Sequence, residues 1–423
     1  MDDNPRGALD GVKVIEFAQN AAVPQCGRLL AGLGADVVKV EPPEGDSMRH
    51  LAKLAATEGR GYATINPGKR AMVVDLTADG ADTVVDAALR WADVALVGLK
   101  QTDLVRFGLD WERVKTVNPR LVHLIFTPFG PDGPSKDEGG YDVLIQGMSG
   151  LGFMMNRTSG GVPAPTRPAV IDFSSGMMSA VGVLAGLRHR DATGAGVRVD
   201  ASLLGTAMSL GTPILASFAK DQERADTIAE DIALLAASGA DFDTQRAHYD
   251  NEMLAAGGAF QLYFRHYLTS DGLISIAGLS PGLIAKWHAV TGLPPVPSGA
   301  RGADPEFVEV VQAAEALFAS RTTDEWLETL GAVGYPCTRY NTPFQAVEDP
   351  QVRANDYTVD LDHPEFGGYT VAGMPIEVSG TRVEIAGRSP MLGEHTSDAL
   401  AEMGLEQLTI DSLRAAGVFG PAD

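Results

Sequence analysis

With 423 residues the chain is long enough to predict two domains, and 45% hydrophobic residues with 48 glycines are typical of a globular, turn-rich protein. Its formal net charge of −22 argues against nucleic acid and anionic membrane surfaces as partners, because both are bound through basic patches. Two cysteines, Cys26 and Cys337, are too few for a disulfide framework or a metal cluster, so we expect no metal.

The first part of the chain alternates predicted strands with predicted helices. Residues 1–6 carry no basic and apolar leader, which favours a cytoplasmic protein, and the apolar runs are interrupted before the roughly 20 residues that a membrane span needs. The pattern of apolar residues places strands at 9–17, 35–41, 71–76, 93–98 and 121–127, and helices at 24–33, 79–91 and 111–117. Strands that alternate with helices predict a parallel, doubly wound sheet.

Loops that follow the predicted strands are candidates for a ligand site, because open α/β sheets bind ligands at the carboxyl ends of their strands. The loop from Gln19 to Pro24 lets a ligand approach the backbone, although no glycine-rich dinucleotide or P-loop motif follows any strand. Cations in such loops are either solvated surface charges or ligands for phosphate. Four cations lie in these loops, namely Arg49, Lys69, Arg70 and Arg106.

Asp172 follows the apolar run 169–171 and precedes a predicted helix from about Ser174 to Arg190. That helix is built almost wholly of small and apolar residues, so we expect it to be buried. As an N-cap, the Asp172 side chain would accept a backbone N–H of the first turn. As a nucleophile, it would be kept ionised by the helix dipole while apolar surroundings exclude water. The local sequence leaves both interpretations open.

The rest of the chain predicts a helical middle, a separate module and a return segment. A helix is predicted at 203–219, and the acidic residues 220–256 indicate surface helix or a connection between lobes. A hairpin of 260–268 and 272–277, with helices near 283–291, 305–320 and 323–330, indicates a module that begins near Gly257. The tail is interpreted as strands within 367–385 and 389–403, then a loop at 392–396 leading into a helix. His395 in this loop is interpreted as structural, with a role near a site as the alternative.

Short motifs follow one another over nearly the whole chain. They lie at 9–14, at 33–41 with Gly45-Asp46, at Lys69-Arg70 leading to Asp75-Leu76, at 118–121, 130–134, Tyr141-Asp142, Asp172, 193–196 and 392–396. In this order and spacing the chain resembles the family III CoA-transferases, which include formyl-CoA and carnitine CoA-transferases and α-methylacyl-CoA racemases.

The resemblance implies a fold and an assembly. It implies a Rossmann-like large domain assembled from both ends of the chain, a smaller α+β domain, and two chains interlocked as a homodimer. We therefore expect the N-terminal part of a large CoA-binding domain at 1–220, a helical linker at 221–256 and a small domain at 257–335. A return linker and the C-terminal part of the large domain would follow at 336–423.

The resemblance also implies an activity, that of an acyl-CoA:carboxylate CoA-transferase. Its substrates would be a CoA thioester and a carboxylic acid, with no permanently bound cofactor. Asp172 matches the catalytic aspartate, which would carry an acyl anhydride and then an aspartyl-CoA thioester, and Asp142 matches an acidic neighbour of the catalytic centre. Positions at or near the CoA site of the family fall on Ala21, Ala22, Lys69, Arg106 and Tyr141.

The chain departs from the family pattern at two places near the expected nucleotide site. Gly98-Leu99 stands where many members carry Asn and an aromatic or similar residue, and Pro42 replaces a basic residue that contacts CoA in some members. The racemase branch carries His where this chain has Tyr141, which favours a transferase. Two alternatives remain, a 2-methylacyl-CoA racemase or epimerase and a non-catalytic CoA-binding subunit of a hetero-oligomer, and the retention of Asp172 speaks against the second.

Overall fold

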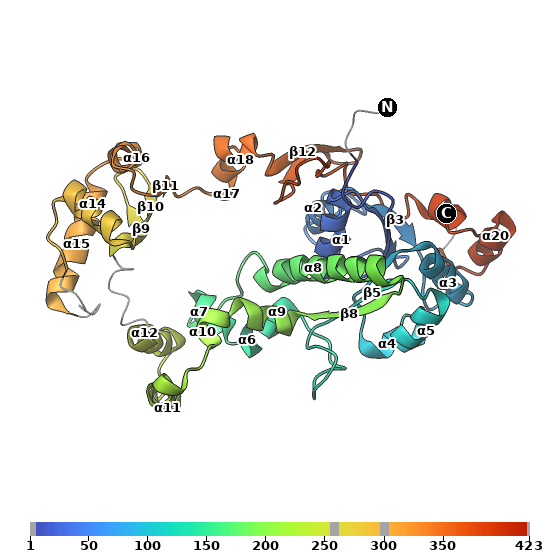
Figure 1. Cartoon of the computed structure of the whole chain (residues 1–423), viewed down its shortest axis with the longest axis horizontal. Coiled ribbons are helices and arrows are strands. Elements are labelled where there is room, and N and C mark those ends of the chain that lie inside the picture. The colour runs from blue at the N-terminus through green and yellow to red at the C-terminus, as the bar shows by residue number, and fades with distance from the viewer. Residues whose placement is uncertain (1–5, 254–261, 297–303, 421–423) are drawn as a thin grey trace. The chain divides into compact units, whose positions relative to one another are not determined.

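The computed structural model describes residues 6–253, 262–296 and 304–420, which form two compact units (Figure 1). Unit 1 comprises residues 1–157, 164–216 and 351–423, and unit 2 comprises residues 158–163 and 217–350. Both ends of the chain therefore contribute to unit 1. The expected start of the small domain near Gly257 lies outside the described residues.

Unit 1 is built on a six-stranded sheet in the order β3-β2-β1-β4-β5-β8, and all its neighbouring strands are parallel. The strands are β1 (Lys13–Phe17), β2 (Asp36–Glu41), β3 (Arg70–Val73), β4 (Val94–Val97), β5 (Val122–Thr127) and β8 (Val197–Ser202). This order confirms the predicted doubly wound sheet. The strand order reverses between β1 and β4, and open α/β sheets bind ligands outside the carboxyl ends of the strands at such a point.

Helices cover both faces of the sheet, because successive strand residues point to opposite sides. On one face, Val14 belongs to a core with α1 (Ala22–Gly32) and α8 (Val170–Thr193). On the other face, Ile15 belongs to a core with α3 (Ala81–Trp91), α5 (Trp111–Val117), α19 (Thr396–Glu402) and α20 (Gln407–Ala415). His395 takes the predicted structural role, since its Nδ1 accepts a hydrogen bond from the backbone N–H of Ala71 at 3.3 Å.

The remaining elements of unit 1 are short. They are η1 (Ser47–Arg49), α2 (Arg60–Ile65), α4 (Gln101–Arg106), α6 (Asp142–Met148), α7 (Leu151–Met155), α9 (Leu203–Leu210), α10 (Thr212–Leu215) and the antiparallel pair β12 (Thr358–His363) and β13 (Gly367–Ala372). Helix α18 (Pro350–Ala354) begins at the boundary between the units. The predicted strands beyond residue 372 are wrong, because residues 373–395 form turns and one isolated bridge, Gly7 with Arg382.

Helix α8 corrects the expectation of a fully buried helix. One side packs on α1, β5 and β8, whereas Met177, Met178 and Val181 on its other side are exposed. By length and composition alone, α8 could also cross a membrane. This corrects the expectation that every apolar run is too short for a membrane span. One such helix is weak evidence, and the packed side of α8 accounts for much of its apolar composition.

Unit 2 combines helices with small sheets. Its three-stranded sheet, β11-β10-β9, is formed by β9 (Phe264–Leu268), β10 (Leu273–Ala277) and β11 (Cys337–Arg339), and the β9-β10 pair confirms the predicted hairpin. Aromatic residues including Trp287, Phe318 and Trp326 fill its core. The other elements are β6 (Thr158–Ser159), β7 (Val162–Pro163), η2 (Ala219–Asp221), α11 (Gln222–Ala237), α12 (Phe242–Met253), α14 (Pro281–Thr291), α15 (Pro305–Ala319), α16 (Thr323–Ala332) and α17 (Pro343–Ala346).

Candidate active site

A cavity of about 380 Å³ lies at the point where the strand order reverses. Its walls come from the segments that follow β1, β4 and β5, together with the first turns of α1, α6, α8 and α9. The lining residues include Asn20, Ala22, Gly98, Lys100, Pro128, Tyr141, Leu144 and Asp172. The cavity therefore brings the predicted catalytic Asp172 together with Ala22 and Tyr141, two of the predicted CoA-site residues.

Asp172 lies inside the first turn of α8, because the helix begins at Val170 and Ala169 occupies the N-cap position. The cap position makes no side-chain hydrogen bond, so the interpretation of Asp172 as the N-cap is wrong. Burial, and secondly the charge of Asp142, raise the pKa of the Asp172 carboxyl to about 6. A carboxylate held in this way is a stronger nucleophile than one paired with a cation.

The capping acceptor for α8 comes instead from α6. One carboxylate oxygen of Asp142, Oδ2, accepts the backbone N–H groups of Ile171 at 2.9 Å and of Asp172 at 3.1 Å. The other oxygen, Oδ1, accepts a hydrogen bond from the Gln146 side chain. Asp142 is buried, and through these contacts its carboxylate caps the first turn of α8, the turn that carries Asp172.

The loop between β1 and α1 forms another wall of the cavity. Ala21 and Ala22 are buried at the start of α1, and Asn20 adopts a φ of 68°, which a non-glycine residue rarely does. The Asp46 carboxylate accepts the backbone N–H of Asn20 at 3.2 Å, and the Ser47 hydroxyl contacts the Asn20 side chain at 2.7 Å. These bonds hold the loop in a strained shape that is already open toward the cavity.

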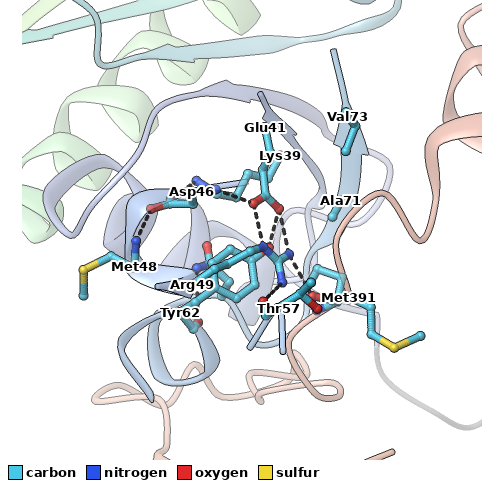
Figure 2. Close-up of polar contacts among 12 residues, drawn as sticks. Lys39, Glu41, Asp46, Met48, Arg49, Thr57, Tyr62, Ala71, Val73 and Met391 are labelled. Carbon is cyan, nitrogen blue, oxygen red and sulfur yellow. Dashed lines mark hydrogen bonds and ion pairs between the residues drawn. The ribbon is translucent and has the colours of Figure 1, made fainter. Parts of the chain in front are cut away.

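A buried ion network lies behind this loop (Figure 2). Lys39 pairs with Glu16 at 3.0 Å and with Asp46 at 2.9 Å, and it also donates to the carbonyl oxygen of Ala18. Figure 2 shows Arg49 pointing into the same region, where its guanidinium forms two bonds to Glu41, at 2.7 Å and 2.8 Å. The network thus anchors the loop at both Ala18 and Asn20.

Arg49 also has a second carboxylate partner. Its Nη1 pairs with Glu58 at 2.7 Å, and its guanidinium stacks 3.5 Å from the centre of the Tyr62 ring. Burial raises the pKa of Glu58 to about 7 in spite of the neighbouring Arg49. The prediction of Arg49 as a phosphate ligand is therefore wrong, because its donors are already bonded inside the protein.

Lys69 is part of the same network. Its ammonium is fully buried, pairs with Glu16 at 2.8 Å, and donates to the Asn66 side chain at 2.9 Å and to the carbonyl oxygen of Pro24 at 2.7 Å. Burial lowers the pKa of Lys69 to about 8, while Glu16 acts in the opposite direction. All three donors are thus occupied, so contact between Lys69 and a CoA phosphate would require these bonds to break. Arg70 is likewise engaged, with Asp36 and Glu402.

Two of the cations that line the hollows at this edge of the sheet, Lys100 and Arg106, form no ion pair among the described residues. Arg106 is exposed, lies over the ring of Phe107 and lines a hollow that shares Leu76 and Phe107 with the one lined by Pro42, so its role at phosphate stays a prediction. Lys100, which the sequence reasoning missed, lines the same cavity as Asp172. A Cβ at Gly139 would lie at an ordinary contact distance of 3.4 Å from Cε of Lys100, so these two positions lie next to each other in the wall of the cavity. The sequence signal that could have indicated Lys100 is its position three residues after the end of β4, where open α/β sheets bind ligands.

The two departures from the family pattern lie in adjoining hollows. A Cβ at Gly98 would lie 3.0 Å from Ala18 and 3.1 Å from Val23, so this position admits little more than glycine. Pro42 lines a second hollow of about 380 Å³ at the ends of β1, β2 and β3, which shares Gln19 and Leu99 with the first. The Tyr141 side chain is 66% exposed at the mouth of the Asp172 cavity.

Comparison with known proteins gives one consistent result. The sequence pattern of CoA-transferase family III matches residues 9–396. A formyl-CoA:oxalate CoA-transferase of Streptomyces avermitilis is 28% identical, over 97% of this chain and 99% of its own. A succinate–glutarate CoA-transferase of Agrobacterium fabrum is 28% identical, over 95% of this chain and 96% of its own.

Solved structures agree with the sequence relatives. The crystal structure of Rv3272 from Mycobacterium tuberculosis superposes with a TM-score of 0.73 at 26% identity, and covers 93% of this chain and 99% of its own. A CAIB/BAIF family protein from Brucella suis gives a TM-score of 0.72 at 26% identity, and covers 94% of this chain and 100% of its own. The likeness thus extends over nearly the full length of each protein.

Proposed function

Because the chain belongs to CoA-transferase family III and is thus an enzyme that transfers CoA, we propose that it moves CoA from an acyl-CoA donor to a free carboxylic acid by covalent catalysis on Asp172. The observation that carries this proposal is the Asp172 carboxylate itself. It lines a cavity at the reversal point of the sheet, and burial raises its pKa to about 6, so it is ionised but poorly solvated at neutral pH.

The chemistry suits a carboxylate nucleophile. The Asp172 carboxylate attacks the thioester carbonyl, which forms an acyl-aspartyl anhydride and expels CoA as its thiolate. The thiolate then attacks the aspartyl carbonyl, which releases the donor acid and leaves an aspartyl-CoA thioester. The acceptor carboxylate attacks this thioester, which forms an acceptor–aspartyl anhydride and expels the CoA thiolate a second time. The thiolate then attacks the acceptor carbonyl of this anhydride, which gives the new acyl-CoA and releases the Asp172 carboxylate. Partial burial of Asp172 limits hydrolysis of the intermediates.

The CoA moiety would follow the carboxyl edge of the sheet away from Asp172. Ala21 and Ala22 offer a backbone approach at the start of α1, and Tyr141 flanks the cavity mouth. Lys100 and Arg106 supply cations for the phosphates, whereas Lys69 supports the loop from behind. CoA acts here as substrate, and the proposal requires no permanently bound cofactor.

Racemase chemistry is the second candidate, because racemases occur among the relatives that the sequence resembles. A racemase needs a base on each face of the substrate Cα, and a histidine is the common choice for such a base. None of the described residues that line the Asp172 cavity is a histidine, and the exposed Tyr141 stands next to Asp142. This observation supports transfer over racemisation.

The assembly proposed from the resemblance, a homodimer, has support in unit 1. Four apolar side chains at helical spacing form an exposed stripe along α8, which we call the α8 stripe: Met177, Met178, Val181 and Leu184. An apolar stripe on a helix is expected to be covered, and we propose that a second copy covers it. Light scattering should give a mass near twice 44.5 kDa, and Val181→Asp should lower it. A monomeric wild type would contradict this assembly.

The activity test uses the purified chain alone. The protein is incubated with succinyl-CoA or acetyl-CoA and a panel of free carboxylic acids, and new CoA thioesters are identified by mass spectrometry. We expect exchange with at least one acid and no solvent deuterium at Cα of the acyl group. Deuterium incorporation at Cα without acid exchange would favour the racemase alternative, and activity that appears only with a second homologous chain would establish a hetero-oligomer.

A further inference from the structure

Gln146 lies one helical turn after Asp142 on α6, and it is buried. Its Nε2 donates to Oδ1 of Asp142 and to the hydroxyl of Thr166 at 2.9 Å, and its Oε1 accepts the backbone N–H of Thr166 at 3.1 Å. The amide therefore uses both Nε2 hydrogens and its oxygen. One buried side chain ties the carboxylate that caps α8 to the segment that leads into α8.

We propose that Gln146 is a positioning residue, which holds the Asp142 carboxylate on the first turn of α8 and thereby fixes the place of the nucleophile Asp172. The proposal rests on the proposed function, because it concerns the nucleophile of that reaction. Gln146 touches no residue that we place in contact with substrate, and it acts through Asp142 and Thr166.

The geometry explains why a carboxylate cap needs such support. The Oδ2 atom of Asp142 faces the two backbone N–H groups of α8, but a side chain held by one oxygen could still rotate about its Cβ–Cγ bond. The bond from Gln146 to Oδ1 removes that freedom, since both oxygens then have fixed donors. An error of about 1 Å in the position of a reacting group can cost roughly 10²-fold in rate.

The same contact sets the charge that Asp172 experiences. Among the described residues, Asp142 from α6 accepts the backbone N–H of Asp172, and Tyr141 and Lys100 are the other titratable groups that line its cavity. The charge of Asp142 is, after burial, the second cause of the raised pKa of Asp172. If Asp142 leaves the first turn of α8, this repulsion decreases and the pKa of Asp172 falls toward its ordinary value.

The hydrogen bonds of Gln146 to Asp142 and Thr166 form what we call the clamp, and Thr166 is its second anchor. Its backbone N–H and its hydroxyl both face Gln146, so the chain before Ala169 is held at the same amide that holds Asp142. Position and charge at Asp172 are therefore linked through one residue. A purely structural glutamine would be expected to stabilise the fold without affecting the titration of Asp172.

The test uses Gln146→Met, which keeps much of the volume and removes every hydrogen bond. The matched control is Gln25→Met, which alters a buried glutamine on α1 that packs near Gly176. We expect Gln146→Met to lower kcat about 10- to 100-fold with little change in the Michaelis constant for acyl-CoA. We expect no such loss of kcat in the control, whatever its thermal stability.

A second readout does not depend on turnover. Carbon-13 labelling of aspartate carboxyls allows Asp172 to be titrated by NMR, with the signal assigned by its absence in Asp172→Asn. We expect the pKa of Asp172 to fall in Gln146→Met and in Asp142→Asn, and the double variant to resemble Asp142→Asn alone. An unchanged Asp172 titration and kcat in a folded Gln146→Met protein would overturn the proposal.

Two further variants keep the test decisive if Gln146→Met does not fold. Thr166→Val removes one acceptor of the clamp and should shift kcat and the Asp172 titration in the same direction by a smaller factor, whereas Thr166→Ser should restore both. Wild-type behaviour of Thr166→Val in both readouts would then overturn the proposal. Absence of CoA exchange in the wild type, with an Asp172 titration that still responds to Gln146, would contradict the proposed function and leave the clamp standing.

Discussion

Two parts of unit 1 bury charged side chains, and they treat them in opposite ways. Behind the β1–α1 loop, Lys39 and Lys69 share Glu16, and Arg49 has both Glu41 and Glu58. At the start of α8, Asp172 is partly buried beside Asp142, a second carboxylate, and forms no ion pair among the described residues.

The presence or absence of an ion pair distinguishes charges that hold the structure from the carboxylate that we expect to react. Paired charges inside the protein fix the shape of the loop, and the removal of one partner leaves a buried charge that is costly. A carboxylate without a cation keeps a raised pKa and the electron density that nucleophilic attack requires. Buried charge alone therefore does not indicate catalysis, and we expect the catalytic group to be the partly buried carboxylate of Asp172, which lies at the reversal point of the sheet without an ion pair among the described residues.

The largest expected effect comes from removal of the unpaired carboxylate. Asp172→Ala should reduce CoA transfer by a factor on the order of 10⁴ or more, because no other group would carry the acyl and CoA intermediates. Circular dichroism and light scattering should show the wild-type fold and assembly. Near-normal transfer by this variant would mean that Asp172 only lines the cavity and is not the nucleophile.

Removal of a paired charge should act on stability. Lys69→Met leaves Glu16 with one cation fewer, so we expect the free energy of unfolding, measured in urea, to fall by about 3–5 kcal/mol. The Michaelis constant for acyl-CoA, measured on the folded fraction, should change little. The opposite pattern, normal stability with a raised Michaelis constant, would restore the original prediction that Lys69 binds CoA.

Lys100 and Arg106, which have no ion pair among the described residues, should affect binding of the donor. Lys100→Gln and Arg106→Gln should each raise the Michaelis constant for acyl-CoA by the equivalent of about 1.5–3 kcal/mol, with little effect on the free acid, because each would lose a charge-assisted contact with phosphate. Steady-state kinetics with both substrates varied will measure this. Lys115→Gln is the matched control, since Lys115 is paired with Glu112 on the surface. Equal effects on both substrates would argue against phosphate contact.

The smallest expected effect is a gain of stability at the active site. The pKa of Asp172 is raised in the folded protein, so its ionisation opposes folding at high pH and ceases to do so as pH falls from about 6 toward 4. The free energy of unfolding of Asp172→Asn, measured in urea at pH 8, should therefore exceed that of the wild type by about 1–3 kcal/mol. This gain in stability should decrease below pH 6. A variant less stable than the wild type at pH 8 would place Asp172 with the structural charges.

Transfer itself should follow the same ionisation. Because the ionised carboxylate is the nucleophile, the rate at low acyl-CoA concentration should fall as pH decreases through about 6. Asp142→Asn should move this decline to lower pH, because it removes the neighbouring charge.

The sequence predicted the alternating strands and helices of the sheet well, since apolar periodicity is local. It missed β8, although residues 197–202 alternate apolar and polar side chains, as a half-buried strand does, and most of these side chains are half-buried in the structure. The helix around Asp172 was predicted too short at its start, and this error produced the N-cap interpretation. The nature of the cap could not be seen in the sequence, because it comes from Asp142 on a separate helix.

The candidate site shows the same limit. Motifs identified Asp172 through resemblance, but a pattern of residues gives no exposure or pairing for a lysine or arginine. Lys69 is paired with Glu16, 53 positions away, and Arg49 with Glu41 and Glu58 across separate segments. The sequence does not indicate that Lys100 shares a cavity with Asp172, because the walls of that cavity come from segments that are far apart in the chain.

The most direct test of the account is to trap the covalent enzyme. After incubation with acyl-CoA alone, Asp172 should carry a CoA thioester that borohydride reduces to the alcohol and hydroxylamine converts to the hydroxamate. Mass spectrometry of the peptide spanning residues 168–188 should locate the changed residue at Asp172, with loss of activity in parallel. Unmodified Asp172 under conditions where CoA exchange between acids is measurable would contradict the account.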